Sequence, residues 1–223
     1  MSTASRVPAA APIDRSQITG IVLAGGMGRR MSADGRGLDK GLQPFRGRPM
    51  VQHAIERLAP QVATLLINAN RNVERYREFG WPVVSDVLAG FAGPLAGLHA
   101  GMMHATTRYV VTVPCDSPFL PLDLVARLAA ALAEAAVGRG ERGSDPAAPP
   151  ARLAVARTGE QAHPVFTLAE RALLPDLEAF LASGQRKIDA WYAPLGAVEV
   201  AFTDERAFRN INTPQELREH ESE

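Results

Sequence analysis

One glycine-rich segment is followed by cationic residues, a combination that binds phosphate groups in many proteins. It runs Leu23-Ala24-Gly25-Gly26-Met27-Gly28-Arg29-Arg30-Met31, and Lys40 comes shortly after it. Glycine lets backbone N–H groups approach phosphate oxygens closely, and cationic side chains neutralise the phosphate charge. Between Met27 and Arg48, six Lys or Arg residues stand against two Asp residues, a local excess of +4. The segment therefore predicts a site for a small polyanionic ligand.

Two common nucleotide-binding motifs do not describe this segment. Counting G-x-G-x-x-G from Gly26 places Met31 where the third glycine of a dinucleotide-binding loop belongs. The chain also contains no G-x-x-x-x-G-K-[ST] sequence, which excludes a P-loop NTPase. The segment is thus a candidate phosphate loop of another kind.

Alternating strand and helix patterns place this segment at the end of a strand. The expected strands are residues 19–24, 64–69, 82–86 and 109–113. The expected helices are residues 49–58, 94–105 and 122–137. This repetition predicts an α/β fold, a mostly parallel sheet with helices on both faces. Such sheets bind ligands at the carboxyl ends of their strands, where the candidates are Ala24-Gly25-Gly26, Asn68, Asp86 and Asp116.

The rest of the chain is expected to complete one domain over residues 18–223. Strand patterns occur at 153–156, 164–168 and 197–202, and helix patterns occur near 169–182, at 186–192 and from Pro214. We expect this C-terminal third to form a smaller lobe. Residues 1–17 are rich in Ala, Pro and Ser and predict a flexible tail, and residues 138–150 predict a flexible loop.

Composition excludes several classes of protein. The 223 residues contain 24 Lys and Arg against 24 Asp and Glu, so no overall basic field favours nucleic acid. A single cysteine, Cys115, excludes a disulfide framework and fits a reducing compartment. No apolar run reaches the eighteen or so residues that span a bilayer. We therefore expect a cytoplasmic protein without a membrane or nucleic acid partner.

Several short motifs occur in a fixed order from about residue 18 onward. Besides the glycine-rich segment they are Asp39-Lys40-Gly41-Leu42, Ile67-Asn68-Ala69-Asn70-Arg71, Gly93-Pro94-Leu95-Ala96-Gly97, Pro114-Cys115-Asp116-Ser117-Pro118, His163-Pro164 and Asn210-Ile-Asn-Thr-Pro-Gln-Glu-Leu217. Together they resemble the molybdenum cofactor guanylyltransferase family. The resemblance implies a Rossmann-like αβα nucleotidyltransferase fold. It also implies transfer of GMP from Mg-GTP to the terminal phosphate of molybdopterin, with release of pyrophosphate.

The resemblance implies roles for residues that the motifs contain. Lys40 and Asp116 would be catalytic, and Asp116 would also bind Mg²⁺, which prefers carboxylate oxygens. The nucleotide would contact Leu23, Ala24, Gly25, Gly26, Lys40, Asn68, Asp86 and Asp116. The acceptor side would include Arg30, Asn210 and Asn212, since Asn offers both donor and acceptor edges to a pterin. For His163, a structural role and a role on the acceptor side both stay open.

Two other functions remain to be separated from guanylyl transfer. A cytidylyl- or sugar-nucleotidyltransferase would use the same sheet, although related cytidylyltransferases usually carry Ala-Ala-Gly where this chain has Ala24-Gly25-Gly26. A non-enzymatic carrier would bind the cofactor without releasing pyrophosphate.

The eight residues between Met31 and Lys40, where about four are expected, lengthen the loop before the lysine. The resemblance also implies transient contact with molybdopterin-synthesis proteins or apo-molybdoenzymes.

Overall fold

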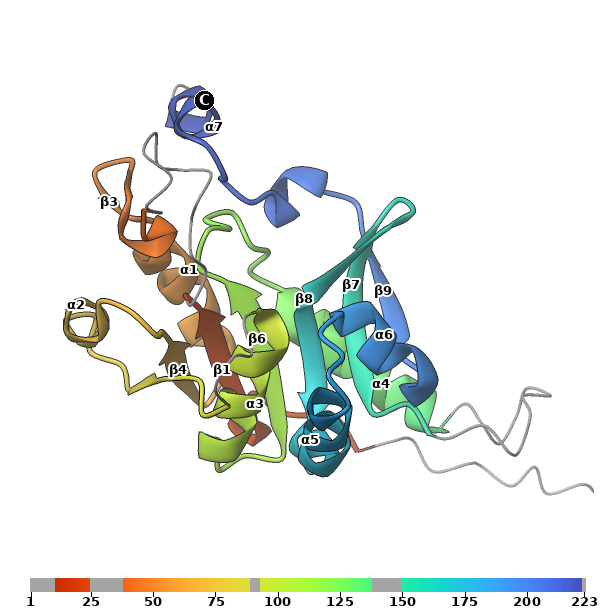
Figure 1. Cartoon of the computed structure of the whole chain (residues 1–223). Helices are drawn as coiled ribbons and strands as arrows, with labels where there is room; N and C mark the ends of the chain where they lie inside the picture. Colours follow the sequence, from red (N-terminus) through yellow and green to blue (C-terminus); the bar gives the residue numbers. More distant parts are fainter. Residues whose placement is uncertain (1–10, 25–37, 89–92, 138–149, 222–223) are drawn as a thin grey trace, which may run out of the picture.

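A seven-stranded sheet organises the part of the chain that the computed structural model describes, residues 11–24, 38–88, 93–137 and 150–221. The strand order is β5-β4-β1-β6-β8-β7-β9 (Figure 1). The strands are β1 (Ile18–Leu23), β4 (Thr64–Asn68), β5 (Val83–Val84), β6 (Tyr109–Pro114), β7 (Leu153–Thr158), β8 (Gln161–Glu170) and β9 (Val198–Phe202). All neighbouring pairs are parallel except the two that involve β8. The predicted α/β fold is confirmed.

The central strands are buried on both faces, which explains their apolar sequences. Every residue of β6 is buried, as are the first five residues of β1. The two buried threonines in these strands have hydrogen-bond partners: Thr19 Oγ1 lies 2.7 Å from Thr107 Oγ1, and Thr112 Oγ1 donates to Val165 O at 2.6 Å. The sheet core is therefore apolar with its hydroxyl groups satisfied.

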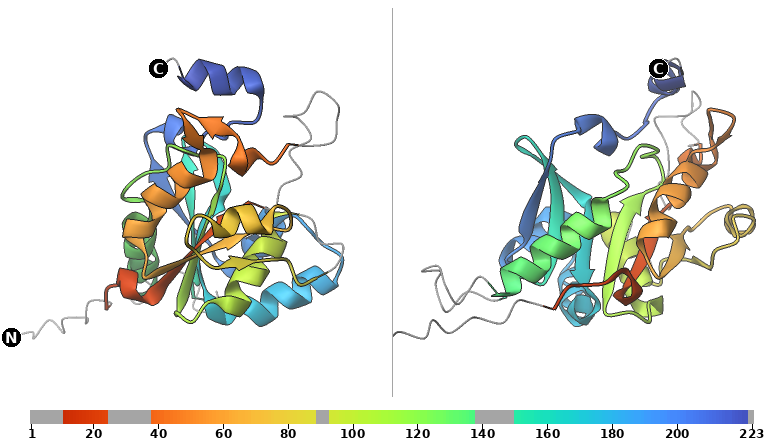
Figure 2. Two further views of the ribbon diagram at one scale, coloured as in Figure 1. Left: turned by 90° about the vertical axis from the view of Figure 1, so that its left-hand side faces the viewer. Right: turned by 180° about the vertical axis from the view of Figure 1, so that it is seen from behind.

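Helices cover both faces of the sheet and enclose two separate cores (Figures 1 and 2). One core contains side chains of α1 (Met50–Leu58) and α4 (Leu124–Val137). The other contains side chains of α3 (Pro94–His104), α5 (Leu174–Ala182) and α6 (Ile188–Tyr192). Two glycines allow close packing: a Cβ on Gly20 would lie 3.0 Å from Leu58 Cδ2, and one on Gly101 would lie 2.1 Å from Ile21 Cδ1. Within the described residues, no helix is long and apolar enough to cross a membrane.

The C-terminal third does not stand apart as the smaller lobe that the sequence predicted. Its strands β7, β8 and β9 continue the same sheet, because β8 pairs antiparallel with β6 along residues 109–112. The helix expected near residues 169–182 begins only at Leu174, since Ala169 and Glu170 belong to this pairing. The last helix of the described residues is α7 (Pro214–Glu221).

Other short elements were not predicted. A hairpin of β2 (Pro44–Phe45) and β3 (Arg48–Pro49) precedes α1, and the five-residue helix α2 (Val73–Arg77) follows β4. The 3-10 helices that bear on the site are η3 (Lys40–Leu42) and η8 (Glu205–Phe208). Part of the predicted N-terminal tail is also ordered: η1 (Arg15–Gln17) contacts the domain through a hydrogen bond from Arg15 Nη1 to Pro60 O. The predicted 138–150 loop falls almost wholly outside the described residues.

Candidate functional site

The predicted site residues lie at the carboxyl edge of the parallel strands. Leu23 and Asn68 end β1 and β4, and Asp86 and Asp116 come two residues after the ends of β5 and β6. Backbone hydrogen bonds fix the end of β1 between its neighbours: Ala24 N donates to Asn68 O, and Cys115 N donates to Leu23 O. Gly25, Gly26 and Arg30 lie outside the described residues.

Asn68 and Asp86 form one half of the site. Asn68 Nδ2 donates to Asp86 Oδ1 at 2.9 Å, and Asn70 Nδ2 donates to Asp86 Oδ2 at 2.8 Å. Asp86 N in turn donates to Asn70 Oδ1 at 2.8 Å. These contacts set the direction of the carboxylate, and each of its oxygens keeps a further lone pair for a ligand. The sequence had pointed to Asn68 and Asp86 but had assigned no role to Asn70.

The first turn of α3 packs directly against Asn68. A Cβ on Gly97 would lie 2.4 Å from Asn68 Oδ1 and 2.6 Å from Leu23 Cδ2, far inside van der Waals contact. Glycine is therefore required here by space rather than by backbone conformation. Gly97, the last residue of the Gly93–Gly97 motif, thus lets α3 pack directly against the side-chain amide of Asn68.

Lys40 joins the other half of the site. Its Nζ donates to Asp116 Oδ2 at 3.0 Å and to Asn212 Oδ1 at 2.6 Å. The side chains of Lys40 and Asp116 are only 16% and 11% exposed, so this ion pair is shielded from solvent. Three predicted site residues that lie far apart in the sequence are therefore in contact.

The segment between η8 and α7 is tied to the end of β6. Ile211 N donates to Asp116 O at 2.9 Å, and Ser117 Oγ donates to Asn210 Oδ1 at 2.6 Å. The fully buried Ile211 side chain packs in a small apolar cluster with Phe45. These contacts hold the segment, and with it Asn212, against Lys40.

Two residues that the sequence did not single out position Asp39, the residue before Lys40. The Asp39 carboxylate accepts hydrogen bonds from Tyr76 Oη and from Asn72 Nδ2. Burial raises the pKa of Tyr76, so its hydroxyl stays protonated and can donate. A Cβ on Gly41 would lie 2.5 Å from Tyr76 Oη, which shows how closely η3 approaches α2. The three asparagines at positions 68, 70 and 72 could have indicated that this segment belongs to the site. The helix α2 that carries Tyr76 has only five residues and is too short to be predicted from periodicity.

Cys115 lies beside this cluster and is buried, as predicted for a small apolar residue at a strand end. Burial is the main cause that raises the pKa of its thiol well above the usual value, and the negative charges of Asp116 and Asp39 add to it. Lys40 opposes the shift but does not outweigh it. The thiol therefore stays protonated and is not an activated nucleophile.

The donor set around Asp116 fits one kind of metal site. Among the described residues, no group of three His, Cys, Asp or Glu side chains could hold a metal ion by itself. Mg²⁺ in phosphoryl-transfer sites is usually held by one or two carboxylates together with substrate phosphates. Asp116 can supply such a carboxylate, so the residues fit a cation that binds jointly with a nucleotide.

A family model and several known proteins resemble this chain. The MobA-like NTP transferase domain family matches residues 20–198. The molybdenum cofactor guanylyltransferase of Ralstonia nicotianae is 52% identical over 210 residues, which are 93% of this chain and 97% of that protein. The structure of molybdopterin-guanine dinucleotide biosynthesis protein A from Archaeoglobus fulgidus has a TM-score of 0.66 at 20% identity, covering 92% of this chain and 97% of that one.

A second solved structure shows how widely the fold is shared. 4-Diphosphocytidyl-2C-methyl-D-erythritol synthase from Anaerococcus prevotii has a TM-score of 0.66 at 12% identity and covers 93% of this chain and 95% of that one. At such identities, structural likeness establishes the fold alone. The sequence relatives and the family match decide the narrower assignment: the chain belongs to the molybdenum cofactor guanylyltransferases.

Proposed function

We propose that this chain transfers GMP from GTP to the terminal phosphate of molybdopterin, forming molybdopterin guanine dinucleotide and pyrophosphate. The observation that carries the assignment of residues is the shielded contact of Lys40 with Asp116 and Asn212, next to the Asn68–Asp86 pair at one sheet edge. One half of the edge offers a fixed carboxylate and amide to a base. The other half offers an ammonium to phosphates and a carboxylate to the cation that accompanies them.

Asp86 is suited to guanine by the pattern of its hydrogen bonds. Both of its oxygens already accept from asparagine amides, which hold the carboxylate in one direction. A guanine base presents two adjacent donors, N1–H and the N2 amino group, to such an acceptor. Cytosine presents one donor beside an acceptor, so the same carboxylate would bind it less well. This difference favours GTP over CTP.

Lys40 is suited to bind the triphosphate without leaving its protein partners. An ammonium group has three N–H donors, and two of them point at Asp116 and Asn212. The third can donate to a phosphate oxygen that binds beyond the carboxyl ends of β1 and β6. The positive charge then offsets the negative charge that builds up on the leaving pyrophosphate.

The transfer reaction requires little covalent chemistry from the protein. An oxygen of the acceptor phosphate attacks the α-phosphorus of GTP in line, the α–β bridging P–O bond breaks, and pyrophosphate leaves with that electron pair. Positioning and charge neutralisation supply most of the acceleration in such reactions. Asn210 and Asn212, on the segment tied to β6, would orient the acceptor side. Transfer of the product to apo-molybdoenzymes stays a prediction.

Asp116 would hold Mg²⁺ together with the nucleotide phosphates. When bound, this cation neutralises phosphate charge and helps to align the triphosphate. The change Asp116→Asn keeps the size of the side chain and removes its negative charge. We expect a folded protein with guanylyl transfer reduced about 10²-fold or more and a weaker response to added Mg²⁺. Full activity at ordinary Mg²⁺ would mean that the cation is held elsewhere.

One assay separates the proposed function from its alternatives. Pyrophosphate release is measured with molybdopterin and, in turn, GTP, CTP, ATP or UTP, and the nucleotide product is identified by mass. Guanylyl transfer predicts release with GTP alone. Release with CTP and none with GTP would identify a cytidylyltransferase. Molybdopterin binding without release from any nucleotide would identify a carrier.

A further inference from the structure

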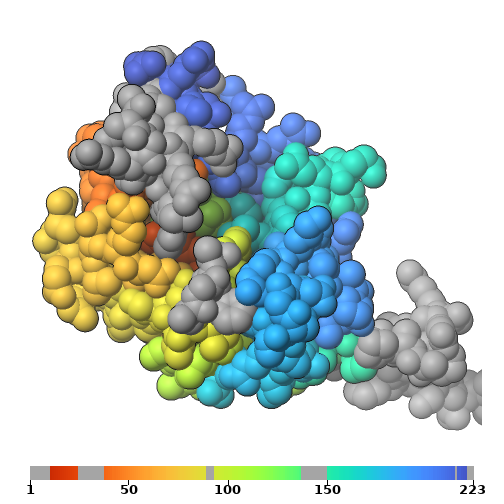
Figure 3. Space-filling model, viewed as in Figure 1, coloured from red at the N-terminus to blue at the C-terminus, as the bar shows by residue number. Residues whose placement is uncertain are grey.

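The segment that joins β4 to α2 contains three asparagines at alternate positions, Asn68, Asn70 and Asn72. We call residues 68–72 the asparagine loop; together with α2 it forms part of the surface at the left of Figure 3, in gold. Its first two asparagines donate to Asp86 in the base half of the site. The third donates to Asp39, the residue before Lys40. One short loop therefore contacts both halves of the site.

Asn72 and Asp39 both occupy positions where their side chains usually cap a helix. Asn72 precedes α2 and Asp39 precedes η3, yet within the described residues neither side chain makes a capping hydrogen bond. Instead, Asn72 Nδ2 donates to Asp39 Oδ2 at 2.9 Å across 33 positions of the sequence, and Tyr76 Oη donates to Oδ1 of the same carboxylate. Both oxygens of Asp39 are thus used to attach η3 to the asparagine loop and to α2, and they do not stabilise η3 itself.

The backbone of Asn72 also shows what its side chain is for. It lies in the left-handed helical region, with φ of 50° and ψ of 32°. Asparagine tolerates this conformation better than most residues, but glycine adopts it at no steric cost. The turn alone is therefore met best by glycine, and the side chain of Asn72 is explained by its contact with Asp39.

The contacts of Asp39 restrict where Lys40 can lie. Lys40 follows Asp39 directly and begins η3, and Asp39 O accepts from Leu42 N at 3.3 Å and from Gln43 Nε2 at 3.1 Å. Because a lysine side chain is a flexible stem, the position of its ammonium depends on a fixed backbone. A displacement of about 1 Å in a catalytic group can cost about 10²-fold in rate. Fixing Asp39 therefore keeps Lys40 Nζ within reach of Asp116 and of the nucleotide phosphates.

Asn70 holds Asp86 in a similar way in the base half. Its carboxamide donates to Asp86 Oδ2 and accepts from Asp86 N, both at 2.8 Å, so one side chain fixes the carboxylate and the backbone of the same residue. Asn70 is exposed, which excludes a role in core packing. Loss of its side chain would release the carboxylate that faces the base and would leave the contacts of Lys40 as they are.

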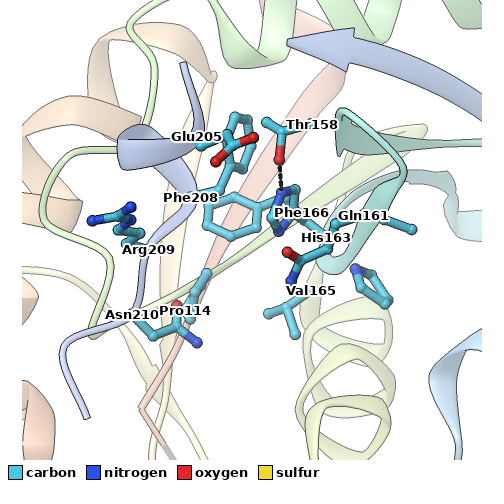
Figure 4. A pocket seen from close by; sticks show the side chains of 12 residues that line it. Pro114, Thr158, Gln161, His163, Val165, Phe166, Glu205, Phe208, Arg209 and Asn210 are labelled. Carbon is cyan, nitrogen blue, oxygen red and sulfur yellow. Dashed lines mark hydrogen bonds between the residues drawn. The ribbon is translucent and has the colours of Figure 1, made fainter. Parts of the chain in front are cut away.

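The asparagine loop is separate from the pocket of about 460 Å³ shown in Figure 4. That pocket is lined by the end of β6, the turn between β7 and β8, Glu205 and residues 208–210, and the His163 and Phe208 rings in it are stacked with centroids 4.7 Å apart. The strand order places β7 and β8 on the opposite side of β6 from β4, where the loop begins. Substitutions in the loop therefore leave this pocket intact.

We infer that Asn70 and Asn72 are positioning residues with separate kinetic roles. Asn70 fixes Asp86 for recognition of the guanine base. Asn72 fixes Lys40, through Asp39, for the transfer of GMP. The inference rests on the proposed function for the reaction that these residues serve. It predicts that two substitutions on one short loop change different kinetic constants.

Three variants test the inference. Asn72→Gly removes the donor to Asp39 and keeps the left-handed backbone, so the fold is retained. Asn70→Ala removes the contacts with Asp86 from an exposed position. Glu74→Gln is the matched control, because it weakens an ion pair within α2 and touches neither aspartate. For each protein, kcat is measured together with the KM for GTP, for ITP and for molybdopterin.

We expect Asn72→Gly to lower kcat about tenfold and to leave the KM for GTP within about twofold of wild type, because the base half is unchanged. Asn70→Ala should raise the KM for GTP about tenfold with little change in kcat, because a charge-assisted hydrogen bond that orients the carboxylate is lost. Glu74→Gln should change neither constant, and the KM for molybdopterin should stay the same in all three variants.

ITP distinguishes recognition of the base from general weakening of the site. Its base lacks the 2-amino group of guanine, so the wild-type protein should have a higher KM for ITP than for GTP. Asn70→Ala should reduce this preference several-fold, since a carboxylate that is no longer fixed does not accept both donors together. Asn72→Gly should keep the preference. The same pattern of change in both variants, or no change in either, would overturn the inference.

A second measurement follows the position of Lys40 without requiring activity. The chain contains one other lysine, the exposed Lys187, so trace acetylation with acetic anhydride gives a ratio of two labelled lysines that mass spectrometry measures. The side chain of Lys40 is only 16% exposed and should react more slowly. Asn72→Gly should raise the ratio of Lys40 to Lys187 labelling several-fold, whereas Asn70→Ala and Glu74→Gln should leave it unchanged. A lower kcat in Asn72→Gly without a change in this ratio would overturn the inference.

The labelling also separates this inference from the proposed function. If the wild-type protein makes no dinucleotide from GTP and molybdopterin, the proposed function fails. The labelling ratio of Asn72→Gly then still tests the position of Lys40, and calorimetric titration of Asn70→Ala with GTP and ITP still tests the role of Asn70. A raised ratio and a reduced preference for GTP would support the inference, and an unchanged ratio or an unchanged preference would overturn it.

Discussion

Lys40→Met is the substitution with the most definite consequences. It keeps the length of the side chain and removes the charge that lies 3.0 Å from Asp116 Oδ2. If Lys40 stabilises the charge that builds up on the phosphates, kcat should fall about 10²- to 10³-fold, the range seen when one preorganised donor is removed. The KM for GTP should change much less, since Asp86 and Asn68 still bind the base.

The same substitution has a cost in stability that the structure allows us to bound. At an effective dielectric constant of about 20, two charges 3.0 Å apart attract by about 5 kcal/mol. Desolvation offsets most of this: exposed pairs are worth about 0–1 kcal/mol, and breaking a buried pair costs about 3–5 kcal/mol. With side chains 16% and 11% exposed, this pair is nearer the buried limit. We expect Lys40→Met to lower the free energy of unfolding by about 3 kcal/mol at pH 7.

Steady-state pyrophosphate release and urea unfolding measure the two effects. Lys187→Met is the control, because Lys187 is the one other lysine of the chain and is exposed. The double variant Lys40→Met/Asp116→Asn should recover part of the lost stability, since it leaves no unpaired carboxylate. Turnover of Lys40→Met within threefold of wild type would refute the catalytic role. A double variant less stable than Lys40→Met would refute the electrostatic reasoning.

Three further substitutions test the surroundings of the site. Gly97→Ala should raise the KM for GTP and lower stability by about 1–3 kcal/mol, because the added Cβ would lie 2.4 Å from Asn68 Oδ1; an unchanged KM would count against the role of Asn68. Tyr76→Phe removes the hydrogen bond to Asp39 and should lower the free energy of unfolding by about 1 kcal/mol. If this contact positions the turn that carries Lys40, kcat should fall while the KM for GTP changes little. Burial holds the pKa of His163 in the folded protein below its usual value of 6.5. The stability that neutral His163 contributes is therefore complete above pH 6.5 and is lost as the pH falls through the folded pKa. Between pH 7.5 and pH 5, the unfolding temperature of His163→Gln should fall less than that of the wild type.

The strand-end residues of the candidate site could be predicted from the sequence because they follow one rule. Apolar runs that end in Asn68, Asp86 or Asp116 read as buried parallel strands, and the carboxyl ends of such strands meet at one edge. The register between β1 and β4, with Leu23 opposite Asn68, then brings the predicted residues together. The strands alone therefore determine the positions of these residues.

The C-terminal third could not be predicted as well, because its pattern was ambiguous. Residues 161–170 form a long antiparallel strand whose first half is only partly buried, so its alternation is weak. A register shift between Val155 and Ala156 in the paired strand interrupts the pattern further. The local sequence predicted that Ala169 and Glu170 belong to a helix, but in the structure they pair with β6 and belong to the sheet.

The two halves of the site differ in how far along the chain their contacts reach. The base half is assembled from Asn68, Asn70 and Asp86, which are separated by at most 18 residues. The phosphate half includes the contact of Lys40 with Asn212, 172 residues apart, and this contact needs the segment after η8 to be docked at the end of β6. Because local unfolding releases such a terminal segment more readily than a central strand, loss of its docking should abolish transfer before it abolishes nucleotide binding. We therefore expect a truncation of Ile211, the buried anchor of that segment, to weaken guanylyl transfer much more than GTP binding.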